Sequence, residues 1–380
     1  MQNEKVLFDE AVRMRNLGRR LPDDAVERSD GVLQLIKEFE DRQIEGFRRS
    51  DFAAKPLPRV LVDYVDNPVI GGCAFFHHDS YILSVSIGAL KTSRYLFNRL
   101  MATPEVFPNV GNATKETKNL PVIPLTMSFS ELEARIQKEG YSWAAFVPKD
   151  AVRRNLADFM FFNATLFLLF HEFRHIQAGH IDFASDTLKL SSIQELPFIG
   201  SSIRDSMACQ ALEVDADNCA MQSLLQQWCD QIEVPDQNSE QVREALSRPD
   251  VFLSLFMVSC CGLFRIFDKF DKPPPTSWPY LSHPPSRVRR LFLLANAQNF
   301  IEAKGKARLF PRHGVISPEL VSLLEVDSQK IWGQGFDDTY STEVFSEKGP
   351  RHASEIKKMG KSIGSDVAKY SFITSLGEFF

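Results

Sequence analysis

The sequence lacks the features of two large classes of protein, disulfide-stapled folds and strongly basic nucleic-acid binders. It has no C-x-x-C pair, and its cysteines are dispersed along 380 residues: Cys73, Cys209, Cys219, Cys229, Cys260 and Cys261. Disulfide frameworks belong to short, cysteine-dense chains, so we expect buried thiols in a reducing compartment. The 44 Lys plus Arg and 49 Asp plus Glu give a formal net charge of -5. This balance argues against a nucleic-acid partner held by phosphate neutralisation.

Hydrophobic runs long enough to cross a bilayer are also lacking. The longest, Phe159–Phe170 and Val251–Phe264, have 12 and 14 residues, against the roughly 20 that a membrane-spanning helix needs. The first fifty residues interleave ten basic with eleven acidic side chains, unlike a secretory leader. We therefore expect two buried helices, no membrane span and a cytoplasmic location.

The residues that are present describe a globular protein. Hydrophobic residues make up 44% and charged residues 24% of the chain, and the 31 Phe predict an aromatic core. The length exceeds that of one ordinary domain. We expect an N-terminal helical region over 1–58, a central domain over 59–304 and a C-terminal extension over 305–380. The first of these carries an apolar stripe at helical spacing: Val32, Leu35, Ile36, Phe39, Ile44 and Phe47.

Three short β-type runs follow, and they predict a small antiparallel sheet with a hairpin. They are Arg59–Val65, Gly72–Phe76 and Tyr81–Ile87. His77 and His78 fall on the tip of the hairpin. Such a pair could bind metal, but on a polar turn we favour the interpretation that both are simply solvated.

The rest of the chain reads as helix, so the expected fold class is α+β and mainly helical. The longest helix should run from about Asp150, an N-cap, to about Gly179, a C-cap, and be buried because its second half is apolar on every side. Further helices are expected at 90–101, 203–232, 241–247, 250–268 and 286–303, with an extended proline-rich loop at 272–285. Ile356–Tyr370 predicts an amphipathic helix that docks on its own domain.

The long helix carries an H-E-x-x-H motif, formed by His171, Glu172 and His175. Residues four apart on an α-helix lie about 40° from each other, so both imidazoles can bind one zinc ion. Glu172 can then take a proton from a metal-bound water. The alternative is a core helix with two hydrogen-bonded histidines, but a charged Glu172 in so apolar a helix would be costly without a cation.

A hydrolytic zinc site needs a third protein ligand, and the next helix supplies a candidate. It contains E-x-x-A-D-x-x-A, with Glu213 and Asp217 on one face. We expect Glu213 to bind the metal and Asp217 to accept the other ring N–H of a zinc-bound histidine. The alternative is a solvated acidic face, which the small neighbours Ala216, Cys219 and Ala220 argue against.

His180 is a competing third ligand, but its position does not fit. Metzincins place a third histidine six residues after the second, with glycine at three, and these positions are Ile181 and Ala178. A helix continued from His175 would rotate His180 by about 140°. We therefore expect His180 to stay off the metal.

Together these motifs resemble the gluzincin metallopeptidases, particularly the group that contains the prenyl-protein endoprotease and the bacterial heat-shock membrane endopeptidase. Those families carry a later H-P-x-x-x-x-R at the start of a helix, which His283–Arg289 matches. Gly72–Phe76 is the analogue of the edge strand that pairs with the substrate. The layout is also similar to that of the soluble phage-exclusion peptidases. The resemblance covers about 70–300, with two departures: Arg174 stands where the motif is usually uncharged, and residues 71–75 lack an edge-strand Asn.

The resemblance implies a zincin-like core with an active-site helix and a glutamate helix, and a zinc-dependent endopeptidase that acts on a protein or peptide. His171, His175 and Glu213 would be the zinc ligands and Glu172 the general base. His283 is the expected oxyanion donor, with Tyr280 as the second candidate.

Two alternatives remain open at this point. The first is a catalytically silent, zinc-binding interaction module, which would bind metal without cleaving peptides. The second is a membrane-associated protease, anchored by Val251–Phe264 or by the helix at 356–370.

Overall fold

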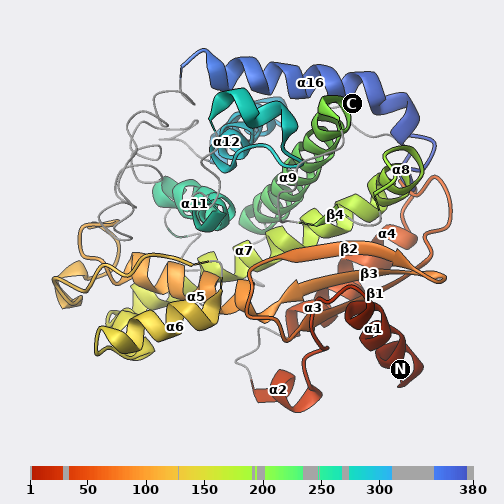
Figure 1. Cartoon of the computed structure of the whole chain (residues 1–380). Coiled ribbons are helices and arrows are strands. Elements are labelled where there is room, and N and C mark those ends of the chain that lie inside the picture. Colours follow the sequence, from red (N-terminus) through yellow and green to blue (C-terminus); the bar gives the residue numbers. More distant parts are fainter. Residues whose placement is uncertain are drawn as a thin grey trace.

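The computed structural model describes residues 2–28, 34–126, 128–190, 193–194, 202–233, 247, 249–267, 274–309 and 346–374. In this part of the chain a small sheet lies between helix α1 (Gln2–Met14) on one face and the long helix α7 (Ala151–Gln177) on the other (Figure 1). The protein is thus α+β and mainly helical, as predicted.

The N-terminal region is helical, as expected, but built of short pieces. These are α1 (Gln2–Met14), α2 (Asp23–Arg28), α3 (Gln34–Phe39), the π-helix η1 (Glu40–Ile44) and α4 (Glu45–Arg48). Leu35, Phe39, Ile44 and Phe47 of the predicted stripe are buried. Val32 and the side chain of Ile36 lie outside the described residues.

The three predicted strands form, as β1 (Arg59–Val65), β2 (Gly72–His77) and β3 (Ser80–Ser86), with a fourth, β4 (Ile193–Gln194). The sheet order is β1-β3-β2-β4. The prediction of an antiparallel sheet was wrong, because β1 pairs with β3 in parallel, while β2 is antiparallel to both β3 and β4. After the hairpin reverses the chain, β3 enters between β1 and β2 and runs in the direction of β1. The sheet is therefore mixed.

Alternation along the strands gives the sheet two apolar faces. On one face Leu61, Phe75 and Ile82 pack against Phe8 and Val12 of α1. The opposite face joins the main core, which also includes most of the buried side chains of α7. A sheet covered on both faces therefore holds β2 firmly beside α7.

Helix α7 begins and ends close to where the sequence predicted. The Asp150 side chain caps its N-terminus by accepting the Arg153 N–H at 3.3 Å. Its C-terminus is followed by Gly179 at φ +74°, the left-handed conformation that glycine adopts without strain. By length and composition α7 is one helix, among the described residues, that could cross a bilayer, but 83% of its most apolar segment is buried inside the protein.

Most other expected helices are also present. The remaining elements are α5 (Ile87–Met101), η2 (Ala113–Lys115), α6 (Phe129–Lys138), η3 (Trp143–Phe146), α8 (His180–Thr187), α9 (Ile203–Glu233), α11 (Pro249–Phe267), η5 (Pro275–Tyr280), α12 (Ser286–Ala303), η6 (Lys306–Leu309) and α16 (Lys348–Val367). The prediction at 241–247 lies outside the described residues except for Ser247. The proline-rich segment is not simply extended, because Pro275–Tyr280 is a 3-10 helix, whose backbone angles suit proline.

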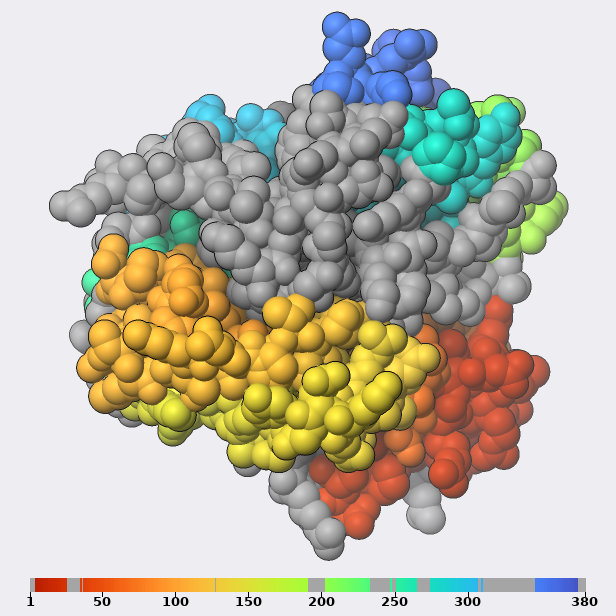
Figure 2. All heavy atoms as spheres, turned by 60° about the vertical axis from the view of Figure 1, so that its left-hand side comes forward, coloured from red at the N-terminus to blue at the C-terminus, as the bar shows by residue number. Residues whose placement is uncertain are grey.

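The amphipathic C-terminal helix α16 docks on the protein itself, as predicted. Ile356, Ile363 and Val367 are buried in a cluster that includes Ala208 and Leu212 of α9. Both Figure 1 and Figure 2 place α16 (blue) on the side of the molecule opposite the N-terminal helices (red). Beyond α16 the chain returns to the N-terminal region, where the Ala54 N–H donates to the Phe372 carbonyl at 2.8 Å and the Thr374 N–H donates to the Phe52 carbonyl at 2.9 Å.

Candidate metal centre

Helices α7 and α9 pack against each other and bring the three expected ligands together. His171 and His175 project from α7, and Glu213 projects from α9. The two histidine Nε2 atoms are 3.1 Å apart. The Glu213 carboxylate oxygens lie 3.4 Å from each of these nitrogens, Oε2 facing His171 and Oε1 facing His175. The three side chains are 1% exposed.

These separations match the spacing of ligands around one metal ion. With metal–ligand bonds of about 2.1 Å, two ligands of a tetrahedral zinc ion lie about 3.4 Å apart. The observed 3.1 to 3.4 Å therefore leaves room for a single ion in contact with all three atoms. Among the described residues, the same three side chains form one of two groups that could hold a metal ion.

A carboxylate orients the first histidine. His171 Nδ1 lies 3.0 Å from Asp217 Oδ1, so the Nδ1–H donates to Asp217 and the lone pair of Nε2 points toward Glu213. Arg289 in turn holds Asp217 with two hydrogen bonds, each of 2.7 Å. Arg289 is the last residue of the H-P-x-x-x-x-R motif, and this contact gives that arginine a structural role.

The second histidine is oriented by a longer chain of contacts. His175 Nδ1 lies 3.1 Å from His180 Nδ1, and His180 Nε2 lies 3.4 Å from Asp215 Oδ2. With His180 donating to Asp215, its Nδ1 accepts from His175, and the lone pair of His175 Nε2 also points toward Glu213. Arg174 holds Asp215 through two hydrogen bonds of 2.6 and 3.2 Å.

Two imidazole lone pairs and a carboxylate therefore converge on one buried point. Three electron-rich groups in a buried site repel one another unless cations offset them. Arg289 Nη2, 3.5 Å from Glu213 Oε2, offsets part of the carboxylate charge, and a metal ion between the three ligands would satisfy the imidazole lone pairs as well. The donor set of two nitrogens and one oxygen is also the one that zinc enzymes use. The residues present thus fit a zinc ion.

Burial and the arginines set the protonation of the site. Burial, above all, lowers the pKa of His175 well below its ordinary value, so the imidazole is neutral and able to bind metal at pH 7. Burial alone would raise the pKa of Asp217, but the Arg289 guanidinium outweighs that effect and holds the pKa below its usual value. Arg174 does the same for Asp215. Both carboxylates are therefore charged acceptors for the histidine chains.

Glu172, the neighbour of His171 on α7, lies against strand β2 of the sheet. It is 2% exposed, and its Oε1 sits so close to β2 that a Cβ built on Gly72 would approach to 2.5 Å. Only a glycine at position 72 leaves the carboxylate its place. The sequence pattern places Gly72 in a strand, but it does not indicate this contact.

His283, in the segment before α12, reaches the same cluster. Its Nε2 lies 3.4 Å from Glu213 Oε2, and its Nδ1 is 3.0 Å from the Ser282 hydroxyl. The geometry is compatible with the expected donor role. Tyr280, the second candidate, is 46% exposed at the end of η5, and its contact with the chain is through its carbonyl, which accepts from the Ser206 hydroxyl.

The supposed substrate edge of β2 is partly covered. Cys73 and Ala74 pair with Gln194 and Ile193 of β4, so at these two residues β2 has strands on both sides. The cluster itself is closed, because none of its members, Asp217 and His283 included, is more than 5% exposed. A peptide would reach it only after the covering segments had moved.

Four residues around the ligands have roles that the sequence did not predict: Gly72, Asp215, His180, which orients His175, and Arg289. One of them, Asp215, left a signal together with its partner Arg174. Asp215 falls between Glu213 and Asp217 in a helix otherwise rich in apolar residues, and Arg174 is a cation in the apolar second half of the long helix. An unexpected charge of each sign in two buried helices indicates that they pair.

Comparisons with protein-family models, with curated proteins and with solved structures find no match. The case for a function therefore rests on the residues and geometry of this chain.

Proposed function

We propose that the protein is a zinc-dependent endopeptidase with a zincin-like core, in which His171, His175 and Glu213 hold the zinc ion. The observation that carries the proposal is the convergence of these three buried side chains, at 3.1 to 3.4 Å from one another. The H-E-x-x-H and E-x-x-A-D-x-x-A motifs support it independently.

The chemistry follows from the positions of the protein groups. Zinc, when bound there, supplies a Lewis acid and lowers the pKa of a bound water toward about 7. Glu172, next to His171 on α7, would accept a proton from the attacking water and would later return a proton to the leaving amine. His283 donates a hydrogen bond to the oxygen on which negative charge develops. Asp217 and His180 keep the two zinc-binding rings in place.

The proposed substrate is an intracellular protein or peptide, and the proposed location is the cytoplasm. The balanced charge of the chain gives no support for a nucleic-acid substrate.

The test compares wild type with Glu172→Gln, which is nearly isosteric but cannot take up the proton. We expect this variant to keep its zinc and its fold and to lose cleavage of casein and of cellular proteins mapped by terminal proteomics. Glu302→Gln, a change of the same kind at an exposed position of α12, is the control and should cleave like wild type. Cleavage by Glu172→Gln at even about a tenth of the wild-type rate would contradict the role of Glu172.

The closed cluster favours a second candidate function, a zinc-binding module without catalysis. A structural zinc site is typically shielded from substrate, and every member of this cluster is at most 5% exposed. Zinc in wild type together with no cleavage of any tested protein would support this candidate over the peptidase.

A further inference from the structure

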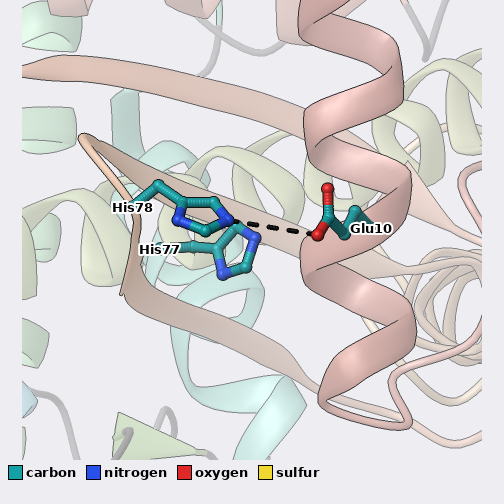
Figure 3. Close-up of side chains that lie close together, drawn as sticks. All are labelled: Glu10, His77 and His78. Carbon is teal, nitrogen blue, oxygen red and sulfur yellow. Dashed lines mark ion pairs between the residues drawn. The ribbon is translucent and has the colours of Figure 1, made fainter.

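A second group of metal-binding side chains lies on the surface, where α1 passes the tip of the β2–β3 hairpin (Figure 3). Glu10 comes from α1, His77 ends β2, and His78 begins the turn. One nitrogen or oxygen from each of the three side chains lies within 4.8 Å of those from the other two. His78 Nε2 and Glu10 Oε1 are 4.0 Å apart, and the two imidazole centroids are 4.2 Å apart.

The fold holds these groups in place from two sides. Phe8, Ala11 and Val12 bury one side of α1 against the sheet, which fixes the helix beside the hairpin. His78 has φ +53°, a left-handed conformation that is uncommon for residues other than glycine but several-fold enriched for Asn, Asp and His. This turn places the His78 ring next to His77 instead of on the opposite face of the strand.

One nitrogen of this group, on His77, lacks a hydrogen bond among the described residues. This nitrogen, Nε2, is buried and has no hydrogen-bond partner in the part of the chain that the structure describes. A buried polar nitrogen without a partner is costly, and a metal ion is one way to satisfy it.

We propose that Glu10, His77 and His78 form a second zinc site, which links α1 to the β2–β3 hairpin. The site is distinct from the buried centre and does not depend on it. Two imidazole nitrogens and one carboxylate oxygen are ligands that Zn²⁺ prefers, and the exposed side of the group leaves the remaining position to water.

The three side chains would need to move only slightly closer together to bind one zinc ion. Ligand atoms of a tetrahedral zinc ion lie about 3.4 Å apart. The candidate ligand atoms of Glu10, His77 and His78 lie within 4.8 Å of one another. Glu10 and His78 are exposed, with side-chain exposures of 53% and 63%, so their rotamers can adjust without disturbing the core. Arg15, the nearby cation, is drawn away toward the ring of Phe75, 5.0 Å from its centroid.

The experiment measures bound zinc in the full-length protein after dialysis against micromolar ZnCl₂, together with the rise of the melting temperature caused by zinc. The test variant is His77→Gln/His78→Asn, because Asn tolerates the left-handed turn. We expect it to bind one zinc equivalent fewer than wild type, whatever the buried centre holds. Asp79→Asn, in the same turn, is the matched control and should bind as wild type does.

Glu10→Gln gives an independent check, because this residue lies on α1 and leaves the hairpin sequence intact. We expect zinc to bind at this site at least about tenfold more weakly and the zinc-dependent rise of the melting temperature to shrink. Equal zinc content in wild type and His77→Gln/His78→Asn would overturn the site. Wild-type affinity in Glu10→Gln would overturn the link to α1.

Discussion

Among single residues, each imidazole of the proposed metal centre is oriented by a chain of contacts that ends in an arginine. Asp217 links His171 to Arg289, and the pair His180 and Asp215 links His175 to Arg174. The arginines keep the carboxylates charged, and the charged carboxylates keep the Nδ1–H of each ligand occupied. This leaves both Nε2 lone pairs for metal.

Asp217→Ala tests the shorter chain. We expect zinc affinity to fall about 10- to 100-fold, because the His171 ring loses its acceptor and Arg289 loses two hydrogen bonds. Competition with a fluorescent zinc chelator measures the affinity. Asp230→Ala, at an exposed position of the same helix, should have wild-type affinity. If Asp217→Ala did as well, Asp217 would have no part in holding the ligand.

Gly72→Ala tests the position of the general base. The added Cβ would lie 2.5 Å from Glu172 Oε1, so the carboxylate must move, while the three zinc ligands are not touched. We expect kcat to fall at least about tenfold, since general-base catalysis is worth about 10²- to 10⁴-fold, with zinc content unchanged. Gly46→Ala, where an added Cβ meets nothing within 4 Å, is the control. Full activity in Gly72→Ala would show that Glu172 need not occupy this place.

Among the helices and strands, an element could be predicted from the sequence where its signal, such as a capping residue, lies within or next to the element itself. The caps Asp150 and Gly179 bound α7 to within a residue or two, and the expected 286–303 helix is α12. The sheet order was not predictable in this way, because alternation shows which side of a strand is apolar but not which strand lies beside it.

The candidate site also combines contacts that a local sequence pattern predicts with contacts between residues far apart in the sequence. The periodicity of an α-helix places His171 and His175 together, and Glu213 with Asp217, so the ligands could be proposed from sequence. The contacts of Gly72 and Arg289 join residues that are 100 and 72 positions from their partners, Glu172 and Asp217. No local pattern encodes such a distance, so these roles required the structure.

The end of α7 offers a test of element packing. Gly179 has φ +74°, and a Cβ there would lie 2.4 Å from the backbone of Tyr370. Gly140 has a similar φ of +76° but nothing within 4 Å. Gly140→Ala should therefore cost about 1 kcal/mol from backbone strain, and Gly179→Ala about 3 kcal/mol or more from strain plus overlap. Urea unfolding measures both. Equal costs would mean that residue 370 does not pack against the end of α7.

At the scale of the whole molecule, the terminal helix α16 is tied to the centre through buried polar contacts. His352 Nε2 lies 2.8 Å from Gln210 Oε1 of α9, and the Gln210 amide nitrogen donates to the carbonyls of Trp278 and Leu281 at 2.7 Å. Burial lowers the pKa of His352 from 6.5 to about 4. Three segments that are far apart in sequence thus depend on one neutral imidazole.

This gives the stability of the protein a predicted pH dependence. Because the pKa of His352 is lower in the folded state, the protein takes up a proton at His352 when it unfolds at a pH between the two pKa values. The neutral imidazole therefore contributes fully to the free energy of unfolding above pH 6.5, and this contribution is lost as the pH falls toward 4. Between pH 7 and pH 5 the loss should be about 2 kcal/mol. Between pH 7 and pH 5, the free energy of unfolding measured with urea should therefore fall by about 2 kcal/mol less in His352→Gln than in wild type. An identical pH profile for the two proteins would contradict a buried neutral His352.

The central claim is that Glu213, and not His180, completes the zinc site with His171 and His175. Elemental analysis of purified protein tests it most directly, in the His77→Gln/His78→Asn background so that only the buried centre is counted. We expect one zinc per chain in this background and in its His180→Ala derivative after saturation, and loss of most of the zinc in the Glu213→Gln derivative. Full zinc in Glu213→Gln together with its loss in His180→Ala would contradict the assignment of the centre.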